Sequence, residues 1–270
     1  MNKSMDEIKC MANRMRMLSL DMAFNAGRNG AHLGGALSAI EIMAVLYGGV
    51  LKKGYECDED RVLISKAHCV LAYYSALYEA GVLSKEDIAG FEKNGSLLTG
   101  HPQRNLQKGI EYSGGSLGMA ISVAVGMAIR KKKTERNGKV YVLLGDGECE
   151  EGSVWESLMV ASHYKLDNLI VIIDNNGLQS DGKVEEIAGE TGFKEKFEAF
   201  GCYVSEVDGH DIASLLKGFE YKHSGRPLVI IADTVKGKGV SFMENDPLWH
   251  HGILTEELYK KARAEVESNG

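Results

Sequence analysis

Two short apolar runs set the strongest constraint on the fold of this 270-residue chain. They are VYVLLG at 140–145 and LIVIID at 169–174, and both give way abruptly to acidic, amide and glycine residues. Near-continuous apolar runs of this length, separated by a helical segment, are typical of parallel strands covered on both faces. A strand–helix–strand crossover takes about 30 residues, which matches the separation of the two runs. The sequence therefore predicts a parallel sheet in which these two strands are neighbours.

The same alternation of strands and helices continues along the chain. Ser38 with Glu41, and Ser153 with Glu156, fit the capping box that starts a helix. The expected helices cover 5–27, 38–47, 68–81, 112–133, 153–164 and 211–222, with one more from Thr255, and the further expected strands cover 60–65, 202–209 and 227–234. No internal repeat or linker interrupts the pattern. We therefore expect an α/β fold with one doubly wound, mainly parallel sheet and helices on both faces, as a single domain over residues 1–270.

The composition excludes several classes of protein. The net charge is −7, with acids and bases interspersed, which argues against a nucleic-acid surface but not against anionic ligands. No apolar run reaches the roughly 18 residues of a membrane span, and the charged N-terminal segment does not resemble a secretory signal. The five cysteines lack zinc-site or redox-motif spacing, and we expect free thiols in a reducing cytoplasm. They are Cys10, Cys57, Cys69, Cys149 and Cys202.

Polar side chains follow both strands at the point where each strand ends. Asp146 comes directly after the first strand, and Asn176 closely follows the second. The carboxyl ends of parallel strands border the crevice in which α/β proteins bind ligands, so these two oxygen donors are expected to converge. Such donors suit Mg²⁺, with Ca²⁺ or Mn²⁺ as substitutes, and Mg²⁺ commonly completes its coordination with phosphate oxygens. Gly145 and Gly147 leave room for a ligand, so the pattern indicates a metal-bridged diphosphate, although each segment alone is also an ordinary turn.

GDGECEEG at 145–152, followed by NN at 175–176, resembles the thiamine diphosphate motif. Over nearly its whole length the chain resembles the N-terminal, diphosphate-binding domain of transketolase, in the form of the shorter subunit of the split, two-gene type. The resemblance implies thiamine diphosphate as cofactor, held through Mg²⁺ on Asp146, Asn176 and the main-chain carbonyl of Leu178. It also places Glu151 near a subunit interface, where this residue helps to transmit proton demand between sites.

Four loops resemble the histidine loops of transketolases. They are GAHLGG at 30–35, ISKAHC at 64–69, LTGHPQ at 98–103 and DPLWHHGIL at 246–254. The resemblance implies catalytic roles for His32, for His101 and for one of the adjacent pair His250 and His251, and cofactor binding by His68. The glycine that follows favours His251 without excluding His250. Imidazole titrates near neutrality, so it can move the hydroxyl protons that C–C cleavage of a ketose requires.

Two further segments resemble the family, and one residue departs from it. YSGGSLGMAIS at 112–122 resembles the stretch beside the pyrimidine and diphosphate of the cofactor, with Gly115 and Leu117 at the contacting positions. TVKGKGVSFME at 234–244 also resembles the family, and its lysines either meet anionic groups or form a solvated charged run. Leu33 stands where transketolases usually have proline, and there the chain is closer to deoxyxylulose-phosphate synthase.

The resemblance implies transfer of a two-carbon ketol unit from a ketose (phosphate) to an aldose (phosphate). In transketolases a second domain supplies the glutamate that acts on the aminopyrimidine, and no second sheet domain is visible in this sequence. We therefore expect a chain that is inactive alone and assembles with a separate C-terminal, pyrimidine-binding transketolase subunit, as a heterotetramer with two copies of each.

The choice of sugar and two other functions stay open. Pentose phosphates, apulose phosphate and sulfonated sugars all fit the resemblance. The chain could instead belong to another thiamine diphosphate enzyme, such as a deoxyxylulose-phosphate synthase. It could also be a non-catalytic subunit that only binds the cofactor.

Overall fold

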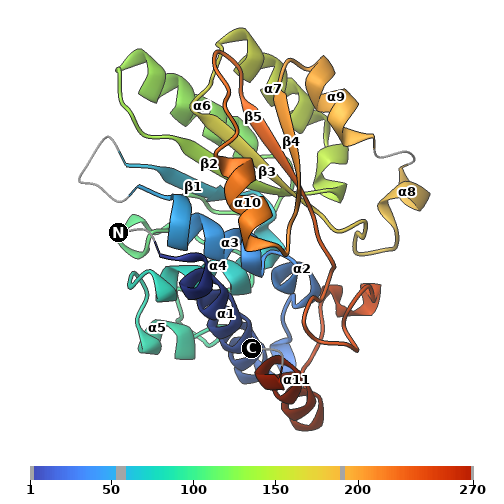
Figure 1. Cartoon of the computed structure of the whole chain (residues 1–270). Coiled ribbons are helices and arrows are strands. Elements are labelled where there is room, and N and C mark those ends of the chain that lie inside the picture. The colour runs from blue at the N-terminus through green and yellow to red at the C-terminus, as the bar shows by residue number, and fades with distance from the viewer. Residues whose placement is uncertain (1–2, 53–58, 189–191, 269–270) are drawn as a thin grey trace.

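A five-stranded, wholly parallel sheet forms the centre of the molecule (Figure 1). The computed structural model describes residues 3–52, 59–188 and 192–268. The strands are β1 (Arg61–Ile64), β2 (Val140–Gly145), β3 (Leu169–Asn175), β4 (Tyr203–Asp208) and β5 (Leu228–Asp233), in the order β1-β2-β3-β5-β4. The predicted α/β fold is confirmed, and the two apolar runs are neighbours, since Val140 pairs with Leu169.

Helices cover both faces of this sheet. Figure 1 shows α6, α7 and α9 on one face, and α1, α3, α4 and α10 on the other. The helices are α1 (Met5–Asn25), α2 (Gly34–Leu37), α3 (Ile40–Val45), α4 (Val70–Glu79), α5 (Lys85–Ala89), α6 (Ala120–Lys133), α7 (Gly152–His163), α8 (Val184–Ile187), α9 (Phe193–Ala199), α10 (Ile212–Phe219) and α11 (Glu256–Ser268). Short 3-10 helices are η1 (Gly27–Asn29), η4 (Ala67–Cys69), η5 (Leu106–Lys108), η6 (Gly147–Glu150) and η7 (Pro247–His250), and η2 (Leu46–Val50) is a π-helical turn.

The strand side chains divide between two hydrophobic cores. All six residues of β2 are buried. Val140, Val142 and Leu144 pack with α6 and α7, whereas Tyr141 and Leu143 belong to the core of α1, α3 and α4. Successive strand side chains point to opposite faces, so a strand without polar positions requires cover on both sides. This requirement explains why the near-continuous apolar runs correctly predicted the doubly covered sheet.

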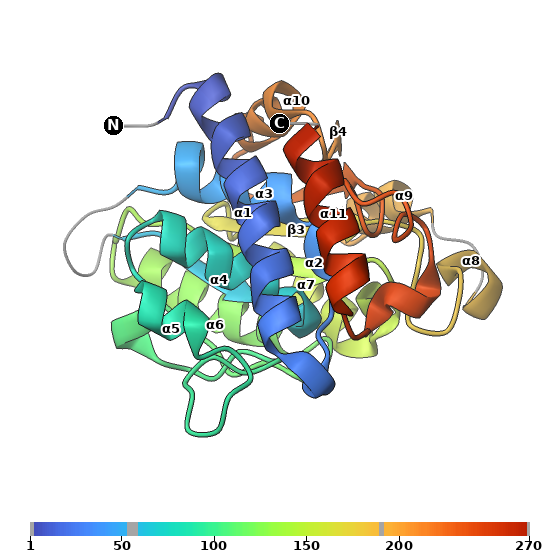
Figure 2. The ribbon, with the colours of Figure 1, turned by 90° about the horizontal axis from the view of Figure 1, so that it is seen from below.

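Helix α11 lies alongside α1, as Figure 2 shows from below. The rings of Phe24 and Tyr259 stack with their centroids 4.3 Å apart. Arg263 and the hydroxyl of Tyr259 both donate hydrogen bonds to Asp21. The C-terminal helix is therefore anchored to the N-terminal one by an aromatic stack and a polar cluster.

The predicted capping box at Ser38 is wrong. A single helix over 38–47 was expected, but the chain forms α2, bends at Ala39 and resumes as α3. The Ser38 hydroxyl does not cap a helix; it donates to Asp174 of β3 at 2.6 Å. Glu41 is held by Arg16 and His210. Both polar side chains, Ser38 and Glu41, therefore bond to residues distant in the sequence instead of capping a helix.

The predicted capping box at Ser153 is also wrong. Helix α7 begins one residue earlier, and the Ser153 hydroxyl donates to the carbonyl of Gly118 at 2.8 Å. The helix expected over 112–133 begins only at Ala120, because residues before it form an irregular loop. Gly118 in that loop has a φ of 72°. The loop and the start of α7 are therefore tied together at the same edge of the sheet.

The cysteines agree with the prediction of free thiols as far as the chain is described. Cys10, Cys69, Cys149 and Cys202 are free thiols, and Cys57 lies outside the described residues. Among residues 3–52, 59–188 and 192–268, no helix has the length and apolar character that crossing a bilayer requires.

Candidate cofactor site

A cavity of about 380 Å³ lies at the carboxyl edge of the sheet, where the loops after β1, β2 and β3 meet. Twelve of the thirteen residues predicted from the sequence line it: His32, His68, His101, Gly115, Leu117, Gly145, Asp146, Gly147, Glu151, Asn176, Leu178 and His250. The thirteenth, His251, lines an adjoining cavity that also contains His32 and His101. A larger cavity of about 650 Å³, between α1 and α10, contains none of these residues.

Asp146 is buried directly after β2, at the start of η6. One carboxylate oxygen accepts from the amide of Gly147 at 2.8 Å, and the other accepts from the amide of Gly177 in the loop after β3. The side-chain oxygen of Asn176 accepts from the amide of Leu178 at 3.1 Å. The predicted carboxylate, amide and carbonyl donors therefore lie on two loops that are joined by a hydrogen bond.

The donor set near Asp146 fits a hard divalent cation. Burial raises the pKa of Asp146 to about 6, although Lys66 opposes the rise, so this carboxylate gains from a nearby positive charge. Within the described residues no group of three or more His, Cys, Asp and Glu side chains could hold a metal. A cation bound here would therefore depend on the Asn176 amide, the Leu178 carbonyl and oxygens of a ligand, the mixed set that Mg²⁺ accepts.

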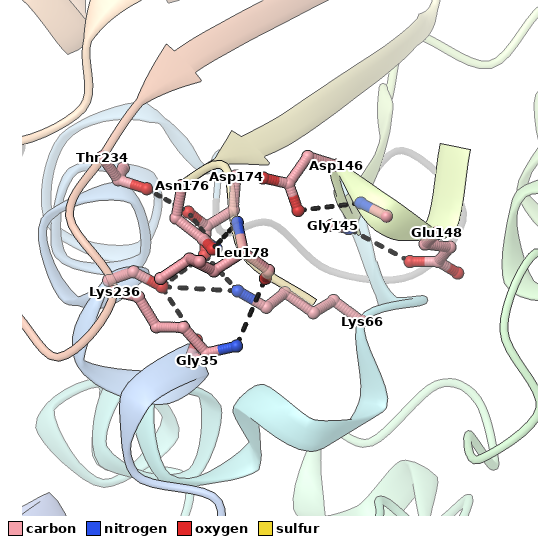
Figure 3. Close-up of polar contacts among 12 residues, drawn as sticks. Gly35, Lys66, Gly145, Asp146, Glu148, Asp174, Asn176, Leu178, Thr234 and Lys236 are labelled. Carbon is pink, nitrogen blue, oxygen red and sulfur yellow. Dashed lines mark hydrogen bonds and ion pairs between the residues drawn. The ribbon is translucent and has the colours of Figure 1, made fainter. Parts of the chain in front are cut away.

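Two buried lysines lie beside these donors, as Figure 3 shows. Lys66 forms an ion pair with Asp174. The Lys236 ammonium donates to the carbonyls of Leu178 at 3.2 Å and Gln179 at 2.8 Å. Burial and the nearby charge of Lys66 lower the pKa of Lys236 to about 8. The ammonium groups of Lys66 and Lys236 therefore form a cationic floor of the cavity, and positive groups of this kind bind phosphate.

The sequence analysis missed Lys66 and left Lys236 undecided. Lys66 stands directly after the strand expected over 60–65 and two residues before a site histidine, a position that could have indicated it. Lys236 is only 1% exposed, so the alternative of a solvated run is wrong for this residue. The alternative of a solvated charged run is correct for Lys238, whose side chain is 38% exposed and whose Nζ lies 3.7 Å from Oε1 of Glu244.

Four histidines gather around His32. The distances from its ring centroid are 6.0 Å to His68, 5.3 Å to His101, 5.4 Å to His250 and 4.6 Å to His251. Burial, followed by its histidine neighbours, lowers the pKa of His32 to about 3, and burial and Lys236 lower the pKa of His250 to about 4. Burial and Lys66 likewise hold the pKa of His68 well below its usual value. These three rings are therefore neutral at neutral pH, each with one donor and one acceptor nitrogen.

The adjacent histidines His250 and His251 face different cavities. His250 ends η7, lies 4.9 Å from the ring of His68, and has its Nδ1 3.3 Å from the ammonium of Lys236. His251 has extended backbone and lines the outer cavity of about 450 Å³ with Glu92. The geometry therefore puts His250 on the cofactor side and His251 on the outer side of His32.

The loop before α6 leaves one side of the cavity open. A side chain at Gly115, where φ is 150°, would be strained but would meet no atom within 4 Å. Leu117 and Glu151 line the same side, and Glu151 is exposed. At position 147 glycine avoids a steric clash, because a Cβ there would lie 2.6 Å from Cγ of Gln179.

Comparisons with known proteins identify the family of this chain. Residues 8–269 match the family model of the transketolase, thiamine diphosphate binding domain. The chain is 39% identical, over 96% of its length and 93% of the relative's, to one of the subunits of the apulose-4-phosphate transketolase of Phocaeicola vulgatus. It is 35% identical, over the full length of both chains, to a 6-deoxy-6-sulfo-D-fructose transketolase subunit of a Clostridium species.

A solved structure gives the same result. The transketolase of Campylobacter jejuni superimposes with a TM-score of 0.89 at 33% identity, over 99% of this chain. That match covers only 43% of the longer protein. The chain therefore belongs to the transketolase family of enzymes and comprises its thiamine diphosphate binding domain.

Proposed function

We propose that this chain is one subunit of a thiamine diphosphate- and Mg²⁺-dependent transketolase. Such an enzyme transfers a two-carbon ketol unit from a ketose (phosphate) to an aldose (phosphate). The observation that carries the proposal is that three kinds of functional group line the same cavity. The cavity is lined by oxygen donors around Asp146, by the buried lysines Lys66 and Lys236, and by the histidines around His32.

The residues present fit the diphosphate end of the cofactor. Asp146, Asn176 and the Leu178 carbonyl would hold Mg²⁺, and the ammonium of Lys236, next to Leu178, would face the phosphate charge. When bound, thiamine diphosphate supplies the carbon nucleophile that adds to the ketose carbonyl. The open side at Gly115 and Leu117 leaves space for the remainder of the cofactor.

The histidines supply proton transfer to the sugar. His32 is neutral and lies at the centre of the cluster, so one of its ring nitrogens is free to accept a hydrogen bond from a sugar hydroxyl during proton transfer. We assign this role to His32, His101 and His251, which share the outer cavity. His68 and His250 face the cofactor cavity and orient its ligand.

A second chain is needed to close the site. Helices α6 and α7 begin beside the cavity and pack side by side, joined by the hydroxyls of Ser122 and Ser157 at 2.8 Å. Their outer surfaces expose a group of large apolar side chains, a feature that marks interaction sites. These are Met119, Val123, Met159, Val160 and Tyr164. We propose that a pyrimidine-binding transketolase subunit covers this α6–α7 face, in a cytoplasmic heterotetramer with two copies of each chain.

The decisive experiment reconstitutes the chain with the candidate partner encoded by a neighbouring gene. The pair, but neither chain alone, should transfer a ketol unit and bind thiamine diphosphate in a Mg²⁺-dependent way in calorimetry. Asp146→Ala should abolish that binding, and unchanged affinity would remove the metal assignment. Ketol transfer at full rate by this chain alone would overturn the need for a partner.

Substrate trials with the same pair separate the remaining possibilities. Relatives of this chain are named for apulose-4-phosphate and for 6-deoxy-6-sulfo-D-fructose, so these sugars are tested beside xylulose and ribose phosphates. Turnover of pyruvate with glyceraldehyde phosphate would instead support a deoxyxylulose-phosphate synthase. Cofactor binding without any turnover would support a non-catalytic subunit.

A further inference from the structure

We propose that three side chains behind the cofactor cavity, Arg16, Glu41 and His210, position Lys236 for the phosphate of the cofactor. This inference rests on the proposed function, because it assigns Lys236 to that phosphate. The three residues come from α1, α3 and the turn after β4. None of them lines the cofactor cavity, so their effect is exerted through the backbone that carries Lys236.

The three side chains form a continuous chain of polar contacts. Arg16 donates to one carboxylate oxygen of Glu41 at 2.5 Å, and Nδ1 of His210 lies 3.0 Å from the other. Arg16 and Glu41 are only 5% and 9% exposed. Burial alone would raise the pKa of Glu41, but Arg16 and His210 hold it below its usual value. The carboxylate is therefore charged and accepts hydrogen bonds from both neighbours.

The segment Val235–Lys238 is tied at both ends by this triad. The amide of Val235 donates to Nε2 of His210 at 2.8 Å. The carbonyl of Lys238 accepts from Nε of Arg16 at 3.0 Å. Between these ends, the amide of Gly237 donates to the carbonyl of Gly34 at 2.9 Å. Three contacts therefore fix the four-residue turn that carries Lys236.

The contact to Val235 fixes the tautomer of His210. Because a backbone amide can only donate, Nε2 is the acceptor, and the proton resides on Nδ1, where it is donated to Glu41. An imidazole in this state joins a donor on one side to an acceptor on the other. Among the natural side chains, a glutamine amide can reproduce both contacts, whereas leucine can reproduce neither.

Lys236 depends on its backbone for its position. Within the described part of the chain, its ammonium forms hydrogen bonds only with the carbonyls of Leu178 and Gln179 and with Nδ1 of His250, and no carboxylate holds it. A displaced 235–238 turn would therefore move the ammonium away from the metal-binding carbonyl of Leu178. Such a shift weakens binding of an anionic ligand without removing any group that touches it.

The test compares His210→Leu with His210→Gln and with a matched control, His223→Leu. His223 also uses both ring nitrogens, which lie 2.9 Å from the backbone carbonyls of Tyr221 and Asp167. These residues precede β5 and β3, at the opposite edge of the sheet. Loss of His223 therefore removes a comparable histidine bridge far from the cofactor cavity.

Two measurements are made on each variant. The first is hydrogen–deuterium exchange of peptides that cover residues 234–240 in the purified chain without cofactor. The second is the dissociation constant of Mg²⁺–thiamine diphosphate from the reconstituted pair. In His210→Leu we expect exchange of the Val235 and Gly237 amides to accelerate about tenfold or more, and the dissociation constant to rise about tenfold. His210→Gln should restore both values, and His223→Leu should change neither.

The outcomes separate this inference from the proposed function. If the wild-type pair binds no thiamine diphosphate, the proposed function fails. The exchange result still tests whether the triad of Arg16, Glu41 and His210 fixes the 235–238 turn. Unchanged exchange in His210→Leu, or equal loss of affinity in the His210 and His223 variants, overturns the inference. If His210→Leu does not fold, His210→Asn replaces it, because its shorter amide cannot reach both partners; wild-type exchange and affinity in that variant would equally overturn it.

Discussion

Lys66 and Asp174 form an ion pair in which the two side chains are 1% and 0% exposed. The pair lies beneath the cofactor cavity, between the end of β1 and the end of β3. Asp174 also accepts hydrogen bonds from the hydroxyls of Ser38 and Thr234. Its carboxylate is thereby satisfied on both oxygens, which is the condition under which a buried ion pair can be kept.

Removing one partner of this pair should strongly destabilise the chain. Lys66→Met leaves the charge of Asp174 buried without compensation, so we expect the free energy of unfolding to fall by about 3–5 kcal/mol. Urea denaturation of the purified variant measures this loss. The double variant Lys66→Met, Asp174→Leu should recover part of it, because no buried charge remains. A loss below about 1 kcal/mol in the single variant would mean that the pair is solvated.

The pKa of His32 predicts how stability depends on pH. Burial and the neighbouring histidines lower this pKa from 6.5 to about 3 in the folded chain. Between these values the His32 side chain binds more protons in the unfolded chain than in the folded chain, so its contribution lowers the free energy of unfolding as the pH falls. Urea denaturation from pH 7 to pH 4 should show this slope. In His32→Asn the slope should be shallower, and an identical slope in both proteins would contradict the low pKa.

His101 and His68 should have separable effects in the reconstituted enzyme. His101 is exposed and lines both cavities, whereas His68 packs against Gly35 and lines only the cofactor cavity. His101→Ala should lower kcat by roughly 10²–10⁴-fold, the usual contribution of a proton-transferring group, with little change in cofactor affinity. His68→Ala should mainly weaken binding of thiamine diphosphate. Steady-state kinetics and calorimetry on the same two variants distinguish these effects.

His250 and His251 should differ in the same way. His250 contacts Lys236 and His68, so His250→Ala should raise the dissociation constant of the cofactor. His251 faces the outer cavity with Glu92, so His251→Ala should raise the KM of the sugar or lower kcat. The two variants serve as controls for each other. Cofactor affinity that falls only in His251→Ala would reverse the assignment.

The sequence located the strands and the loops of the site but not the polar contacts between distant elements. Asp146 and Asn176 were predictable because they follow two apolar strands that are one crossover apart. Ser38 was misread as a local helix cap, since its partner Asp174 is 136 positions away in the chain. Nothing in the local sequence distinguishes a serine that caps a helix from one that reaches a buried carboxylate.

The positioning triad was missed for the same physical reason. Arg16, Glu41 and His210 lie in three segments whose spacing in the sequence follows no motif, and only the packing of α1 and α3 against the turn after β4 brings them together. The cationic floor illustrates an intermediate case. Lys236 was noticed in a lysine-rich segment, but its burial, which decides its role, is a property of the folded chain.

The exposed α6–α7 face predicts where the partner binds. Met159 is 61% exposed on this face, so Met159→Asp would place an unpaired charge in the interface and should weaken assembly by at least about tenfold. Analytical ultracentrifugation of the mixed subunits measures the change, and circular dichroism checks that the variant folds. Tyr221→Asp is the matched control, because Tyr221 is 41% exposed and lies two residues after α10, on the other side of the sheet. Assembly that tolerates Met159→Asp but fails with Tyr221→Asp would move the partner to the opposite side of the molecule.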